Sequence, residues 1–104
     1  MTVDELKQWR DEQKEFRLVD VREQEEWDFC RIEGAVWIPL SAWQDRWQQA
    51  LTDPQEQVVV YCHHGMRSAS AVQFLQRVGF EQLHNLEGGI DAWSRTIDPG
   101  VPTY

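Results

Sequence analysis

The sequence predicts an α/β fold with a mostly parallel sheet. Short apolar segments that are typical of buried strands alternate along the chain with segments that are typical of helices. In addition, 41% of the 104 residues are hydrophobic, which suits one packed core in a chain of this length. We therefore expect a single domain over residues 1–104, without an internal repeat or a linker.

The first half of the chain opens with an amphipathic segment. Val3, Leu6 and Trp9 alternate with charged residues, which predicts a helix over residues 3–13. Residues 16–21 read Phe-Arg-Leu-Val-Asp-Val, a sequence typical of a short buried strand. The eight residues after it are polar and acidic, and we expect one or two helical turns there.

Two prolines mark the ends of the next elements. Residues 34–40 are mostly apolar, and Pro39 is expected to end the strand that they form. Residues 41–51 carry two tryptophans and a leucine at four-residue spacing, which indicates a helix that ends before Pro54. The most strongly apolar strand segment, residues 57–61, is expected to be the central strand.

The last segments continue the alternation of helices and strands. Residues 68–78 predict a helix that Gly79 closes as a C-cap. Residues 83–86 predict a short strand, after which a pair of glycines turns into a last helix over residues 90–94. Proline and glycine interrupt the chain from about residue 97, so we expect an irregular tail.

Cys62 lies where a ligand site is expected in such a fold. It directly follows the central strand and precedes a short loop that opens into a helix, and Asp20 also lies at a strand end. Parallel sheets bind ligands beyond the carboxyl ends of their strands. Loop N–H groups and a helix N-terminus favour negative charge and lower the pKa of a thiol. We therefore predict an activated sulfur at Cys62.

Composition excludes several classes of partner. The net charge of −8 argues against nucleic acid and anionic membranes, which both require a basic surface. No apolar stretch has the length of a membrane span, and no signal peptide is recognisable. Two cysteines do not make a disulfide scaffold. We expect a monomer in the reducing cytoplasm, where Cys62 stays a thiol.

Four stretches resemble the rhodanese family of sulfurtransferases, in the order and spacing of one rhodanese domain. They are Leu18-Val-Asp-Val-Arg-Glu, Ile32-Glu-Gly-Ala-Val-Trp-Ile-Pro-Leu, Val59-Val-Tyr-Cys-His-His-Gly-Met-Arg-Ser and Leu86-Glu-Gly-Gly-Ile-Asp-Ala-Trp. The resemblance implies three layers, with a five-stranded, mostly parallel sheet flanked by helices. It also implies that Cys62 takes the outer sulfur of a donor such as thiosulfate as a persulfide. Cyanide, a thiol or a protein acceptor would then remove that sulfur, and no cofactor is expected.

The active loop of this resemblance comprises the six residues His63, His64, Gly65, Met66, Arg67 and Ser68. Arg67 is expected either to bind an anionic donor or to hold the loop in place. Ser68 either donates to the sulfur or only caps the helix. The two histidines are expected to line the loop and add positive potential near neutral pH. We expect no metal, because adjacent side chains cannot easily close a tetrahedral site.

Charged residues near the first strand have simpler expected roles. Asp20 and Arg22 are expected to form an ion pair that organises the end of the strand beside the loop. Glu23, Glu25 and Glu26 are expected to form a solvated face.

The chain departs from the common family pattern at two places. Cys30-Arg31 stands where Gly-His is common, and Trp37 stands where Asn is common. Cys30 could resolve a persulfide at Cys62 or could simply be buried. A disulfide between them would require Cα atoms within about 7 Å.

Two other functions use a similar loop. Cysteine-dependent phosphatases and arsenate reductases have five residues between cysteine and arginine, whereas this chain has four. The shorter loop disfavours the larger tetrahedral oxyanion. A non-catalytic persulfide carrier or sensor would keep the same loop and differ only in its acceptor.

Overall fold

Four parallel strands form the sheet of the computed structural model, which describes residues 1–104. The strands are β1 (Arg17–Asp20), β2 (Val36–Trp37), β3 (Val58–Tyr61) and β4 (Leu83–Asn85), in the spatial order β2-β1-β3-β4. The central pair β1 and β3 is in register over four residues. The predicted α/β fold with a parallel sheet is confirmed.

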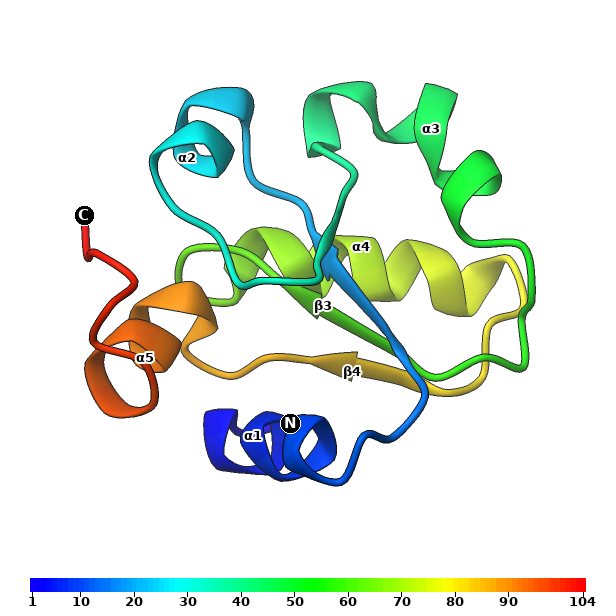
Figure 1. Ribbon diagram of the computed structural model, residues 1–104. Helices are drawn as coiled ribbons and strands as arrows, with labels where there is room; N and C mark the ends of the chain where they lie inside the picture. Colours follow the sequence, from blue (N-terminus) through cyan, green and yellow to red (C-terminus); the bar gives the residue numbers. More distant parts are fainter.

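Helices cover both faces of this sheet (Figure 1). One face packs against α1 (Val3–Asp11) and α5 (Gly89–Thr96), and the other packs against α3 (Trp43–Ala50) and α4 (Met66–Arg77). A short helix α2 (Gln24–Phe29) follows β1, and a 3-10 turn spans Leu40–Ala42.

Each face of the sheet has its own apolar core, and the side chains of β3 alternate between the two. Val58 and Val60 point to the side of α3 and α4, while Val59 and Tyr61 point to the side of α1 and α5. All four residues are fully buried. Because successive strand residues face opposite sides, a continuous apolar strand is what a sheet covered on both faces requires.

The strand count is lower than the resemblance implied. The four strands coincide with the four segments that the residues themselves predicted, and the fifth strand is absent. The chain ahead of β1 forms the predicted helix, α1, where Thr2 and Glu5 make a reciprocal capping box. The strand expected over residues 34–40 shortens to Val36–Trp37. The N–H groups of Ile38 and Leu40 still donate to Asp20 and Val21, and the chain then enters the 3-10 turn.

Helix limits differ from the predicted ones by a few residues. Helix α4 begins at Met66, two residues before the expected start, and Gly65 precedes it in a left-handed conformation. From Ile97 on, the chain has neither helix nor strand. None of the helices combines the length and the apolar character that crossing a membrane requires.

Candidate active site

Cys62 directly follows strand β3 and lies at the carboxyl edge of the sheet. Only 1% of the residue is exposed, and its side chain belongs to the core on the side of α3 and α4. The chain then turns through His63 and His64 to Gly65, whose φ of 112° lets helix α4 begin directly above the sulfur. A side chain at Gly65 would be strained by this backbone conformation.

Hydrogen-bond donors surround the sulfur of Cys62. The backbone N–H of Gly65 lies 3.1 Å from Sγ, the N–H of Ser68 lies 3.4 Å away, and the Ser68 hydroxyl lies at 3.3 Å. Burial raises the pKa of the thiol, but these hydrogen bonds outweigh it and hold the pKa below its ordinary value. A cysteine that only filled the core would have no reason to attract donors to its sulfur.

Asn85 at the end of β4 orients the same network. Its Nδ2 donates to the carbonyl of Gly65 at 2.9 Å, and its Oδ1 accepts from the Ser68 hydroxyl at 2.5 Å. The hydroxyl carries one proton, which it can give either to Asn85 or to the sulfur of Cys62. Asn85 therefore competes with the sulfur for this donor.

Helix α5 holds the start of the loop from beneath. The N–H of Ile90 donates to the carbonyl of Cys62 at 2.9 Å, and the N–H of Asp91 donates to that of His63 at 3.1 Å. Gly88 and Gly89 both have positive φ, 75° and 58°, and no side chain would fit at Gly89 against these carbonyls. The glycine pair thus allows a helix N-terminus to approach the active loop.

Asp20 and Arg22 form a fully buried ion pair at the end of β1. Arg22 Nη2 lies 2.8 Å from Asp20 Oδ2, and Nε contacts both carboxylate oxygens at 3.1 Å. The guanidinium also donates to the carbonyl of Cys30 and to the hydroxyl of Tyr104. The pair therefore ties β1, the segment after α2 and the C-terminal tail together.

Arg67 binds a carboxylate on α2. Its Nη1 and Nη2 donate to the two oxygens of Glu26 at 2.6 and 2.8 Å. The hydroxyl of Tyr104 donates to the same carboxylate at 2.6 Å. Chiefly because of the Arg67 hydrogen bonds, the pKa of Glu26 falls to about 2. The expectation that Glu26 belongs to a solvated face was wrong, because α2 turns it toward the loop.

The two histidine rings contact each other at a tilt, and Tyr104 of the tail stacks on His63. The ring centroids of His63 and His64 are 3.9 Å apart, and Tyr104 stacks on His63 at the same distance. Burial, followed by the neighbouring His64, lowers the pKa of His63 below its ordinary value. The lowered pKa disfavours the charged form of His63, so this residue adds less positive potential than an ordinary histidine would.

One group of side chains could hold a metal ion. Ligand atoms of His63, His64 and Asp91 lie within 4.8 Å of one another. The sequence analysis weighed only the two adjacent histidines and Cys62 as metal ligands. In the structure, helix α5 brings the carboxylate of Asp91 close to the two histidines. Cys62 is not one of the three, and Asp91 is also bound to Arg95 at 3.0 Å.

Cys30 lies on the other side of the sheet from Cys62. It belongs to the core between the sheet and helices α1 and α5, whereas Cys62 belongs to the opposite core. Both are free thiols. The placement favours the reading of Cys30 as a buried residue over that of a resolving thiol.

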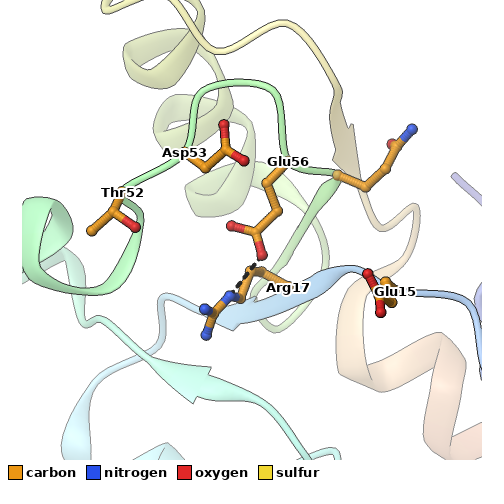
Figure 2. A pocket seen from close by; sticks show the side chains of 6 residues that line it. Glu15, Arg17, Thr52, Asp53 and Glu56 are labelled. Atoms are coloured by element: carbon orange, nitrogen blue, oxygen red, sulfur yellow. Dashed lines mark hydrogen bonds and ion pairs between the residues drawn. The ribbon is translucent and has the colours of Figure 1, made fainter.

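A surface hollow of about 450 Å³ lies at the far end of the strands (Figure 2). It is lined by Glu15, Arg17, Thr52, Asp53, Glu56 and Gln57. Arg17 begins β1, and its Nε is bound to Glu56 at 2.8 Å across the hollow. The hollow therefore lies at the opposite end of the strands from Cys62.

Sequence reasoning did not single out Asn85, Tyr104 or the role of Glu26. Asn85 could have been found, since a polar residue at the carboxyl end of a strand is a candidate site residue. Glu26 is 41 residues from Arg67, and no local pattern connects the two.

Comparison with known proteins identifies the fold. A model described as "Rhodanese-like domain" matches residues 2–96. Thiosulfate sulfurtransferase GlpE of Vibrio cholerae is 33% identical over 88 residues, which cover 85% of this chain and 81% of that protein. A crystal structure of a rhodanese-like domain protein from Staphylococcus aureus is 34% identical with a TM-score of 0.83, covering 100% and 96% of the two chains.

A longer relative contains the whole length of this chain. The "Probable adenylyltransferase/sulfurtransferase MoeZ" of Mycobacterium tuberculosis is 36% identical over 104 residues, which are 100% of this chain and 26% of that protein. The chain thus spans about a quarter of the length of this relative, and its relatives include proteins described as sulfurtransferases. By its family match, its relatives and its fold, the chain belongs to the rhodanese family.

Proposed function

We propose that residues 1–104 form one sulfur-transfer domain in which Cys62 carries sulfane sulfur as a persulfide. The single observation that carries this proposal is the pair of backbone N–H groups, those of Gly65 and Ser68, that donate to Cys62 Sγ. A thiol with a lowered pKa is partly ionised at neutral pH, and the thiolate is the nucleophilic form. A reducing compartment such as the cytoplasm keeps this thiol available.

The first half-reaction loads the sulfur. The thiolate of Cys62 attacks the outer sulfur of the donor, and the sulfur–sulfur bond of the donor breaks. With thiosulfate, sulfite leaves with the electron pair of that bond, and Cys62 retains a persulfide anion. The N–H groups of Gly65 and Ser68 that now face Sγ are the donors that stabilise this charge.

The second half-reaction unloads it. Cyanide or a thiolate attacks the outer sulfur of the persulfide, and the Cys62 thiolate leaves. The products are thiocyanate or a new persulfide, and covalent catalysis has divided one transfer into two steps. A protein acceptor is also part of the proposal, supported by Met66 in the loop, which is 83% exposed and offers apolar contact.

Intact-protein mass spectrometry tests the loading step. Wild type, Cys62→Ser and Cys30→Ser are incubated with thiosulfate and with methanethiosulfonate, a monoanion in which a methyl group replaces one oxygen of thiosulfate. We expect wild type and Cys30→Ser to gain one sulfur atom that cyanide removes as thiocyanate. Cys62→Ser should gain none.

Two results would contradict the proposal. Sulfur uptake by Cys62→Ser would place the nucleophile elsewhere, and Cys30→Ser is the control for the only other thiol. Absence of uptake in every protein with both donors would show that the loop does not perform this chemistry. Uptake that only a protein acceptor can discharge would identify a persulfide carrier.

A further inference from the structure

Glu26 occupies the hydrogen-bonding edge of the loop arginine. Both terminal nitrogens of Arg67 are bound to the two oxygens of this carboxylate, and Tyr104 adds a third hydrogen bond to it. A guanidinium binds an oxyanion through the same forked geometry. An incoming sulfonate or sulfite group would therefore have to compete with Glu26 for Arg67.

The ion pair also removes the positive charge that an anionic donor would meet. The side chains of Arg67 and Glu26 are 37% and 19% exposed, so the pair lies at the protein surface. Beside it, a hollow of about 280 Å³ is lined by Glu25, Glu26, Phe29 and Tyr104. Two carboxylates and two aromatic rings make this hollow unfavourable for a dianion and suitable for an organic group.

This charge pattern acts close to the reacting sulfur. Ser68, the residue after Arg67, donates its N–H to Cys62 Sγ. The pKa of Arg67 is raised chiefly by the hydrogen bonds of Glu26, and the charge of Cys62 adds to this effect. Charges at the ion pair and at the sulfur therefore influence each other.

We propose that Glu26 is a specificity-determining residue that disfavours dianionic donors such as thiosulfate. The preferred donor then carries at most one negative charge, as an organic thiosulfonate or a neutral persulfide does. This inference rests on the proposed sulfur transfer through Cys62. A unit charge at roughly 6 Å in a water-like dielectric changes the affinity of a dianion about tenfold and that of a monoanion about threefold.

Glu26→Gln tests the inference with little change in shape. Glutamine can still accept the N–H of Glu23, which Glu26 Oε1 accepts at 3.2 Å, and it is compatible with a capping box at this position. Asp28→Asn is the matched control, because it removes the same charge from an exposed residue on the same helix that does not line the hollow. Thermal unfolding establishes that each variant is folded.

The readout is the rate of sulfur uptake at limiting donor concentration, with thiosulfate and methanethiosulfonate compared in the same protein. The leaving groups are sulfite and methanesulfinate, and each departs with the electron pair of the broken sulfur–sulfur bond. Glu26→Gln should raise the thiosulfate rate about tenfold and the methanethiosulfonate rate about threefold. The ratio of the two rates then rises about threefold, while Asp28→Asn changes it much less.

A second variant separates competition for Arg67 from simple repulsion. When Arg67→Ala is combined with Glu26→Gln, the part of the gain that depends on the freed guanidinium should disappear. An unchanged rate ratio in Glu26→Gln, with uptake from both donors intact, would overturn the role of Glu26 and leave the proposed function standing. Uptake from neither donor in any protein would instead refute the proposed function.

Discussion

Replacing Gly89 with alanine should disturb the active loop from below. The new Cβ would overlap the carbonyl oxygens of Cys62 and His63, and it would lie 2.6 Å from the carbonyl carbon of His63. These are backbone atoms, so no flexible side chain can move aside. Either α5 or the first peptides of the loop must shift. The hydrogen bond from the N–H of Ile90 to the carbonyl oxygen of Cys62 is then lengthened.

The magnitude follows from two contributions. Gly89 has a φ of 58°, and a left-handed conformation costs a residue with a side chain roughly 1–2 kcal/mol. Overlap with a packed backbone adds about 1–3 kcal/mol. Together, about 2–5 kcal/mol should lower the Tm of a chain of this size by roughly 10–25 °C.

Gly79→Ala is the matched control. Gly79 also has a positive φ, 105°, but no atom lies within 4 Å of the position where its Cβ would be. Gly79 follows the end of α4, far from the loop. Gly79→Ala should therefore lose only the conformational part of the stability, about 1–2 kcal/mol. The comparison isolates the contact between Gly89 and the loop.

Thermal unfolding and the rate of sulfur uptake measure the two consequences. We expect Gly89→Ala to lose more stability than Gly79→Ala and to take up sulfur more slowly at a temperature where both are folded. If the two variants lose equal stability, the overlap is relieved without cost. If Gly89→Ala loads sulfur at the wild-type rate, α5 does not set the geometry of the loop.

Two further predictions concern protons. Ser68→Ala removes a hydroxyl donor from Cys62, so the pKa of the thiol should rise and the rate of alkylation at neutral pH should fall; an unshifted pH profile of alkylation would contradict this. The pKa of Glu26 is about 2 in the folded chain against an ordinary 4.5, so its pairing with Arg67 stabilises the fold above pH 4.5 and this contribution is lost as the pH falls toward 2. The Tm difference between wild type and Glu26→Gln should therefore be largest near neutral pH and vanish near pH 2, whereas a constant difference would show that the ion pair does not contribute.

The sequence predicted those parts of the fold that local patterns determine. Residues 58–61 became the central strand because their branched and aromatic side chains fill both faces of a covered sheet. The position of Cys62 at a strand end also followed from local order. The fifth strand had no such local pattern and came only from the resemblance.

Contacts between distant segments were beyond these patterns. The partner of Arg67 could have been a donor, the loop or solvent, and only the course of α2 across the carboxyl edge brings Glu26 to it. Tyr104 reaches the same carboxylate from 78 residues away. Charge and helix periodicity describe Glu26 correctly as a polar residue but contain no information about which charged residue it faces.

In the proposed mechanism, activation of the sulfur and selection of the donor depend on different parts of the site. Two of the donors to Cys62 Sγ are backbone N–H groups, so thiol activation depends on the course of the chain, which Gly65 and Gly89 permit. Selection depends on side chains at the rim, where Glu26 neutralises Arg67. Changes at the rim can therefore alter which sulfur compound is used while the nucleophile stays the same, whereas changes at the glycines should impair every donor alike.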